Sequence, residues 1–421
     1  MKESLAGEIL KKSDCLTIVK DCLHLQNEND FELLAYKVLK PSNILEGFLG
    51  EYYKLQVDIK EKNSDDVKNL QFFVKSIPVT NEMYRDECER KGFFRKESRM
   101  YAEILPNIQR YVAHDLFPKS YLVRSDILVL EDLSLPEKGF KQLAASEVYT
   151  TKHFHLCLQL LARFHAASIA WETNDGFNIG KKFKDVIFEV QLTTKNEWYI
   201  TGIKAALYLA QHHPKYQYRE AQKFINEELY KIFLNMEEFA TASTTQRNVL
   251  CHRDAWNSNF LWKYDPASQQ PLECRLIDFQ LTCYSPPGID VLNFLYNNFE
   301  NSQRRDREVP ELLKYYHNSL RDELKRLNLP EDLISPKEFE ENCRRALLPV
   351  LTLRAICVPL FSLPNGWASH IRATEQKKFD DYMNSERTEM FERVSKIDPT
   401  YMDKILFPIQ EILEYFNFRA K

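Results

Sequence analysis

Apolar and polar residues alternate in parts of the first third of the chain, which is typical of β-strands. Segment 52–59 places Leu55, Val57 and Ile59 on one side of a half-buried strand. Residues 1–30 have apolar positions at helical spacing and predict an amphipathic extension. The other elements predicted in this part are strands at 31–38, 70–77 and 120–133 and one long helix at 81–105.

Helical spacing dominates after about residue 140. A helix is predicted over 153–171, with Leu161 and Phe164 on one face, and short β-type segments interrupt at 248–261 and 272–279. The pattern therefore predicts the α+β class. The expected domains are a helical extension at 1–30, an N-terminal lobe at 31–135 and a C-terminal lobe at 136–421.

Composition narrows the class of protein. The chain has 421 residues, more than one compact core usually fills, so two lobes are expected. A net charge of −4 gives no reason to expect nucleic acid as a partner. Nine cysteines without CxxC spacing, and no apolar signal segment, favour a reducing, cytoplasmic location. The most apolar stretch, 346–363, contains Arg354 and predicts a buried helix rather than membrane insertion.

The strongest chemical signal lies at 249–261. It has two or more apolar residues, His252-Arg253-Asp254, four further residues, Asn259 and again apolar residues. Asp278 follows within Ile-Asp-Phe. Phosphoryl transfer explains these residue types, because the phosphoryl group needs positioning, charge neutralisation and a base for the proton of the acceptor.

Each of these residues alone would be an ordinary polar loop residue, but the whole string favours function. We expect Asp254 to be the catalytic base, and Asn259 and Asp278 to hold Mg²⁺ through hard oxygen ligands. His252 is expected to support the loop by hydrogen bonding. Cys251 is expected to be a packing residue rather than a reactive thiol.

These residues resemble the protein-kinase-like superfamily, in its aminoglycoside and choline phosphotransferase branch. Further blocks narrow the resemblance to the ecdysteroid kinase-like (CHK kinase-like) family, over about residues 40 to 300. The blocks are Phe73-Val74-Lys75-Ser76-Ile77-Pro78, Phe94 with Glu97 and Tyr101, Leu128 to Leu133, Leu161 to Ser168, and Trp256-x-x-Asn259. The resemblance implies a two-lobed protein-kinase-like fold, whose small lobe has an antiparallel sheet and one long helix and whose larger lobe is mostly helical.

The resemblance also implies an ATP site with Mg²⁺. Lys75 would contact the α- and β-phosphates and pair with Glu97, with Glu87 and Glu89 as alternatives. Lys75 lies in an apolar strand, where a charge is costly unless it is paired. Two more parts of this site are a phosphate-covering turn with Gly47 and Gly50, and a hinge at Glu131 to Leu133 whose backbone would hold adenine.

The sequence departs from the pattern of the family at several positions. Tyr53-Lys54 stands where a small residue is usual, which puts ATP affinity in question. Arg253 replaces the usual Gly. Gln280 replaces the Gly after Asp-Phe, and Asp290 opens a helix, where we expect it to brace the catalytic loop.

The expected function is an ATP-dependent O-kinase acting on a small lipophilic alcohol of ecdysteroid type. The alternative is a catalytically weak nucleotide-binding scaffold, a pseudokinase, which the sparse glycine turn motivates. A protein kinase is a third reading, and the absence of an Ala-Pro-Glu segment from the sequence argues against it. We expect a monomer whose partner is a small-molecule hydroxyl substrate.

Overall fold

The computed structural model describes residues 9–40, 50–62, 66–78, 82–143, 147–299 and 301–421, with the side chains of 82–84 and 87 excepted. The chain divides into two compact units. Unit 1 comprises the described residues of Met1–Phe177 and Asn257–Leu281, and unit 2 those of Asn178–Trp256 and Thr282–Lys421. The predicted lobe boundary at 135/136 stays a prediction.

Unit 1 is built on a five-stranded antiparallel sheet in the order β1-β2-β3-β5-β4. Its main elements are α2 (Lys12–Cys22), β1 (Phe31–Leu39), β2 (Glu51–Glu61), β3 (Val67–Ser76), α3 (Glu82–Lys91), α4 (Phe93–Arg99), the π-helical turn Met100–Ile104, α5 (Leu105–Gln109), β4 (Ser120–Val123) and β5 (Ile127–Glu131). Its other elements are β6 (Phe140–Lys141), α6 (Thr151–Asp175), β8 (Phe260–Tyr264) and β9 (Pro271–Leu276), of which the strands form a small sheet in the order β6-β8-β9.

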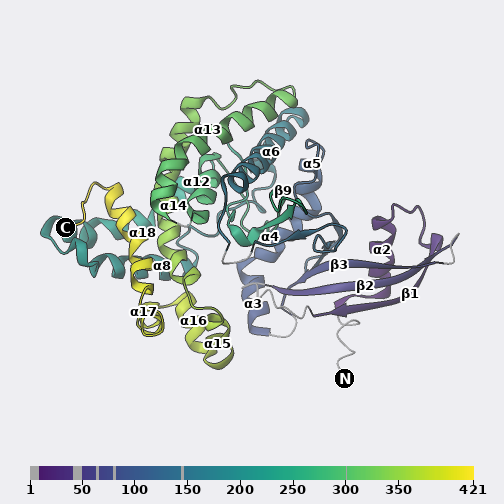
Figure 1. Cartoon of the computed structure of the whole chain (residues 1–421), viewed down its shortest axis with the longest axis horizontal. Coiled ribbons are helices and arrows are strands. Elements are labelled where there is room, and N and C mark those ends of the chain that lie inside the picture. Colours follow the sequence, from purple (N-terminus) through teal and green to yellow (C-terminus); the bar gives the residue numbers. More distant parts are fainter. Residues whose placement is uncertain (1–8, 41–49, 63–65, 79–81, 144–146, 300) are drawn as a thin grey trace. The chain divides into compact units, whose positions relative to one another are not determined.

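One face of the large sheet is covered by α2 (Figure 1). Tyr53, Leu55, Val57 and Ile59 are fully buried on this face, against Ile18 and Val19 among others. The predicted alternation of β2 is therefore confirmed. Because side chains alternate across a strand, the residues between them lie on the opposite face of the sheet.

Two predicted elements differ from the structure. The single helix expected at 81–105 is broken at Gly92, whose φ of +70° is a left-handed conformation that an α-helix cannot contain. The strand expected at 120–133 is two strands, because the Arg124 N–H bonds the Ile127 carbonyl oxygen at 2.9 Å and the chain reverses there.

Unit 2 is almost entirely helical. Its elements are α7 (Ile179–Lys182), α8 (Glu197–Gln211), α9 (Arg219–Phe224), the π-helical turn Ile225–Leu229, α10 (Tyr230–Leu234), α11 (Glu237–Ala240), β7 (Val249–Cys251), β10 (Cys283–Ser285), α12 (Gly288–Asn298), α13 (Ser302–Arg326), α14 (Pro336–Phe361), α15 (Trp367–Thr374), α16 (Gln376–Asn384), α17 (Thr388–Ser395) and α18 (Tyr401–Tyr415). With unit 1, this arrangement confirms the expected fold class.

The long helix α14 organises unit 2, with α12 and α18 packed along it (Figure 1). Gly288 permits the contact with α12, because a Cβ there would lie 2.6 Å from the backbone of Asn342. This helix contains the apolar stretch 346–363 almost entirely, as predicted. Among the described residues, no helix combines the length and apolarity needed to cross a membrane.

Candidate active site

Unit 1 contains a charged cluster of the buried Lys75 and Glu97 with the partly buried Asp278. The Lys75 Nζ lies 2.6 Å from Glu97 Oε2 and 3.3 Å from Asp278 Oδ1. Lys75 is 5% exposed and Glu97 1%. The predicted pairing of Lys75 with Glu97 is thus confirmed. Of the two alternatives, Glu89 is exposed, and the side chain of Glu87 lies outside the described residues.

The strand and helix that carry the pair explain why it forms. Val74 packs on the α2 face of the sheet, so Lys75 projects from the opposite face, which α4 supplies with Glu97. Burial by itself lowers the pKa of Lys75, but the charges of Asp278 and Glu97 raise it well above its ordinary value. Burial raises the pKa of Glu97 to about 7, against the opposing effect of Lys75. The lysine therefore stays an ammonium ion.

Asp278 and Asn259 lie at the same end of the β8–β9 hairpin. Phe260 pairs with Leu276, and the Ile277 N–H bonds the Asn259 carbonyl oxygen at 3.0 Å. Asn259 therefore directly precedes the last residue pair of the ladder on one strand, and Asp278 follows this pair by two residues on the other. Asn259 is 6% exposed. An amide oxygen and a carboxylate so placed suit Mg²⁺, which prefers hard oxygen ligands.

Phe279, the residue after Asp278, packs in an aromatic cluster. Its ring lies 5.8 Å from that of Tyr101, 5.6 Å from Phe117 and 5.9 Å from Phe164. Asp278 has φ +67°, a conformation uncommon for residues with a side chain. Such strain persists only where the surroundings enforce it, and the buried neighbour Phe279 supplies that constraint.

The predicted turn and hinge residues are only partly described. Gly47 lies outside the described residues. At Gly50 a Cβ would lie 3.3 Å from the Ser76 carbonyl oxygen and 3.5 Å from Lys75 Cε, so this glycine allows the chain to approach Lys75 closely. Glu131 ends β5, and its carboxylate pairs with Lys138 at 2.5 Å, while the carbonyl oxygen of the buried Leu133 accepts from the Phe140 N–H. Their role towards adenine stays a prediction.

Tyr52 is a site residue that the sequence did not reveal. It pairs across strands with Lys75, and burial raises its pKa to about 12, against the effect of the lysine. Tyr53, one of the two residues that put ATP affinity in question, faces α2 on the other side of the sheet. The alternation in β2 contained this signal, but placing Tyr52 beside Lys75 also required the register with β3.

Unit 2 holds the catalytic-loop segment, residues 252–256. Both oxygens of Asp290 accept from it at 2.7 Å, Oδ2 from the His252 N–H and Oδ1 from the Arg253 N–H. The Asp254 N–H donates to His252 Nδ1 at 3.3 Å. The expected bracing by Asp290 and the supporting role of His252 are both confirmed.

Two asparagines of α12 and one glutamate complete the support of this segment. Asn293 donates to the Arg253 carbonyl oxygen at 3.0 Å, and Asn298 to that of Ala255 at 3.1 Å. The Arg253 guanidinium lies 2.9 Å from Glu189, with both side chains almost fully buried. Arg253 has φ +70°, which explains why glycine is the usual residue at this position. Nothing in the sequence around Glu189 had pointed to it.

Cys251 is buried in β7, next to the catalytic-loop segment. Burial raises the pKa of its thiol well above the ordinary value, and its S–H donates to the Ser285 carbonyl oxygen at 3.5 Å. A thiol of this kind is unreactive at neutral pH. Its expected packing role is confirmed.

Asp254 belongs to unit 2, whereas Asn259, Asp278 and Lys75 belong to unit 1. The convergence of Asp254 with the other two residues on one cation therefore stays a prediction. Unit 1 by itself presents the charged cluster with the oxygen atoms of Asn259 and Asp278, and unit 2 presents the braced loop that carries Asp254.

Comparison with known proteins gives the class and the family. The Lys75–Glu97 pair and the braced His-Arg-Asp segment are typical of kinase-like proteins. The model of the ecdysteroid kinase-like family matches residues 45–329 of the chain. The match covers more than half of the chain, which therefore belongs to the ecdysteroid kinase-like family. This confirms the resemblance noted in the sequence. No curated protein matches the chain.

Two similar solved structures come from bacteria. A choline/ethanolamine kinase family protein from Mesorhizobium loti is 10% identical, with a TM-score of 0.32, and the match covers 89% of this chain and 92% of that one. An aminoglycoside phosphotransferase from Streptomyces rimosus is 12% identical, with a TM-score of 0.31 and coverage of 77% and 98%. At these scores the assignment rests on the family match.

Proposed function

We propose that this protein is an ATP- and Mg²⁺-dependent kinase that phosphorylates a hydroxyl group of a small lipophilic alcohol, with ecdysteroid-like compounds as the first candidates. The observation that carries the proposal is the buried Lys75 ammonium held by Glu97 and Asp278. A buried lysine with two carboxylate partners is a cation fixed in position, which suits contact with phosphates. The family assignment supports the same class of reaction.

The residues present fit both ATP and Mg²⁺. Lys75 would contact the phosphates, and Asn259 and Asp278 would hold the metal through oxygen atoms. When bound, Mg-ATP supplies the γ-phosphoryl group and neutralises the charge that develops during transfer. Glu97 keeps Lys75 in place, and Gly50 leaves the room beside Lys75 that a side chain would occupy.

Asp254 would accept the proton of the acceptor hydroxyl as its oxygen bonds to phosphorus. A base must be held still to act in this way. The bonds of the neighbouring backbone with Asp290, Asn293 and Asn298 hold the segment on both sides of Asp254. The proposal includes a monomeric protein in the cytoplasm, where ATP is available.

The test is a screen of hydroxyl compounds, ecdysteroids included, with labelled Mg-ATP and detection of a gain of one phosphate by mass spectrometry. The wild-type protein should form a product, and Asp254→Asn should form none while keeping a native circular-dichroism spectrum. Equal turnover by the two proteins would remove Asp254 from its role. A thermal shift with Mg-ATP but no product from any alcohol would favour the pseudokinase alternative.

A further inference from the structure

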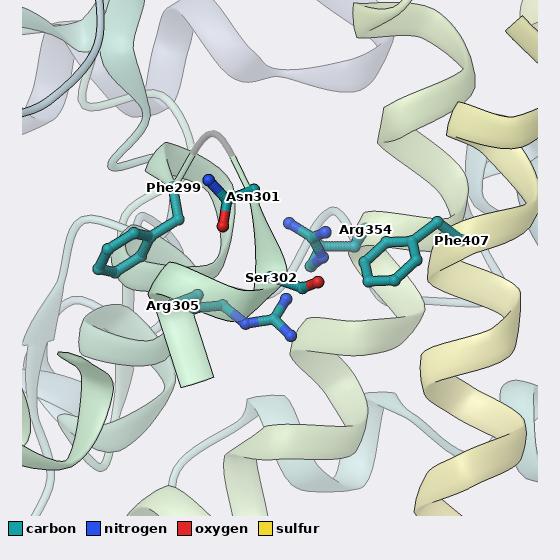
Figure 2. Close-up of a pocket in the computed structure, with 6 residues that line it drawn as sticks. All are labelled: Phe299, Asn301, Ser302, Arg305, Arg354 and Phe407. Atoms are coloured by element: carbon teal, nitrogen blue, oxygen red, sulfur yellow. The ribbon is translucent and has the colours of Figure 1, made fainter. Parts of the chain in front are cut away.

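Unit 2 contains a pocket of about 250 Å³ that the catalytic residues do not line. It is lined by Phe299, Asn301, Ser302, Arg305, Arg354 and Phe407 (Figure 2). In this view the guanidinium groups of the two arginines lie between the two phenylalanine rings. The pocket thus combines apolar walls with two positive charges and the first residue of a long helix, α13.

The two arginines share one buried carboxylate. Arg305 Nη1 lies 2.5 Å from Glu411 Oε1, and Arg354 Nη2 lies 3.3 Å from Glu411 Oε2. Asp306 also contacts Arg305, at 2.8 Å, but its side chain is 65% exposed, so solvent screens its charge. The buried Arg305 and the largely buried Arg354 share one buried negative charge, which leaves an excess of one positive charge beside the pocket.

Arg354 is the less compensated of the two arginines. Burial lowers its pKa, and Glu411 only partly offsets this effect. For Arg305, the effects of Glu411, Asp306 and Tyr296 together outweigh burial, and the pKa is raised. A buried charge that lacks full compensation is costly, and an anion in the pocket would remove that cost.

Two helices of unit 2 connect the pocket to the catalytic-loop segment. On α14, Arg354 and Phe361 lie two turns apart, and the Phe361 ring stacks on Trp256 at 4.6 Å with the ring planes 6° apart. Cys357 lies between them on the same helix. Burial raises the pKa of its thiol to about 12, and the charges of Arg387, Asp254 and Arg354 also affect this pKa.

On α12, the last residue, Asn298, bonds the Ala255 carbonyl oxygen, and Phe299 of the pocket wall follows it directly. The charges of Arg354 and Asp254 both act on the Cys357 thiol of α14. The pocket adjoins the loop that carries the proposed base.

We propose that this pocket binds an anionic group of the acceptor, a carboxylate at one end of an apolar body whose hydroxyl group is phosphorylated. This inference rests on the proposed function and narrows its substrate class from lipophilic alcohols in general to those that also carry a carboxylate, in place of neutral ecdysteroid-like alcohols. The carboxylate pairs with Arg354 and Arg305, and the adjoining carbon atoms pack on Phe299 and Phe407. A volume of about 250 Å³ holds one end of such a molecule rather than all of it.

Matched compounds test the charge requirement. Turnover is measured for a series of ω-hydroxycarboxylates of increasing chain length and for their methyl esters. Binding of the corresponding carboxylates without the hydroxyl group is measured by calorimetry. The kcat/KM of the wild type should be about tenfold or more higher for the acids than for the esters. A tenfold ratio corresponds to ~1.4 kcal/mol. Equal kcat/KM for acids and esters in the wild type would overturn the inference.

Ser302→Asp with Ser302→Asn forms a matched pair of variants. Asp at the start of a helix is favourable for folding, but its charge would repel a carboxylate in the pocket. The Asp variant should lose the preference for acids, and the Asn variant should keep it.

Arg354→Met should also lose the preference for acids, whereas Arg344→Met, on the exposed face of α14, should not. Preference that persists in both Ser302→Asp and Arg354→Met would overturn the inference. Turnover of neutral alcohols without preference for acids contradicts this inference alone, whereas carboxylate binding without phosphorylation of any alcohol contradicts the proposed function.

Discussion

Arg253 shows how a single residue can combine backbone strain with a compensating contact. Its φ of +70° is unfavourable for a residue with a Cβ, while its guanidinium is paired with Glu189 in a fully buried position. Burial alone would lower the pKa of Arg253, but Glu189 and other nearby groups raise it. The side chain thus stabilises a backbone conformation that glycine would adopt without strain.

Replacement of Arg253 should separate these two effects. Arg253→Ala and Arg253→Gly both remove the buried counter-ion of the Glu189 carboxylate, at a cost of about 3–5 kcal/mol. Only the alanine retains the strain, so the glycine variant should be more stable by about 1 kcal/mol. Urea denaturation monitored by fluorescence measures the difference. An alanine variant as stable as the glycine variant would contradict the assignment of strain to this residue.

At the scale of elements, α12 acts as the support of the catalytic-loop segment. Asp290 lies in its first turn, accepts two backbone N–H groups and is fully buried. Asn293 and Asn298 lie further along the same helix. These hydrogen bonds fix the backbone of the loop relative to α12.

Asp290→Asn should impair turnover without affecting nucleotide binding. Asparagine offers only one acceptor oxygen, so one buried N–H loses its bond, at about 1–3 kcal/mol. We expect a lower kcat, an unchanged KM for ATP and lower stability, measured by steady-state kinetics and urea denaturation. Asp332→Asn, at an exposed position, is the control. An unchanged kcat would show that the segment keeps its geometry without Asp290.

A buried histidine lies at the start of α6 in unit 1. His153 is buried there, with Nδ1 bonded to Thr150 and Nε2 lying 3.1 Å from the Tyr264 hydroxyl oxygen. Burial lowers its pKa below the ordinary value of 6.5. The unfolded chain therefore binds a proton more readily than the folded one in the range below about pH 6.5.

Stability that is complete above about pH 6.5 should therefore be lost progressively as the pH falls below that value. His153→Gln should flatten this part of the dependence of unfolding free energy on pH, and replacement of the exposed His114 should not. Thermal unfolding between neutral and mildly acidic pH is the measurement. The same acid dependence in His153→Gln and the wild type would assign the effect to other groups.

At the scale of the whole molecule, the predicted functional residues are divided between two units. The groups expected to hold nucleotide and metal belong to unit 1, and the expected base belongs to unit 2. Binding and turnover should therefore be separable by mutation.

Lys75→Met should abolish detectable binding of Mg-ATP in isothermal calorimetry, because it removes the proposed phosphate contact and leaves Glu97 buried without the ammonium that pairs with it. Asp254→Asn should bind Mg-ATP as the wild type does but transfer no phosphate. Lys20→Met, which changes a lysine outside the charged cluster, is the control. Equal loss of nucleotide binding in Lys75→Met and Asp254→Asn would argue against this division of roles.

Local pattern was sufficient to predict most elements. The alternation in β2 and the helical stretch of α14 were predictable, because each depends on periodicity. The pairing of Lys75 with Glu97 was implied by the family resemblance, and the cost of burying a lone charge supported it. The break at Gly92 was not predictable, since a glycine inside a helical pattern does not reveal whether its φ is positive.

By itself, the sequence determined the α+β class and carried the resemblance to the kinase-like family, and it predicted Lys75, Asp254, Asn259 and Asp278 as the phosphotransfer residues. Only the tertiary structure decided that Tyr52 rather than Tyr53 lies beside Lys75, that Glu189 pairs with Arg253, and that two arginines border one pocket. The chemical identity of the residues and their local spacing can be read directly from the sequence. Strand register and the partners of buried charges arise from contacts between residues far apart in sequence, and these contacts exist only once the core has formed.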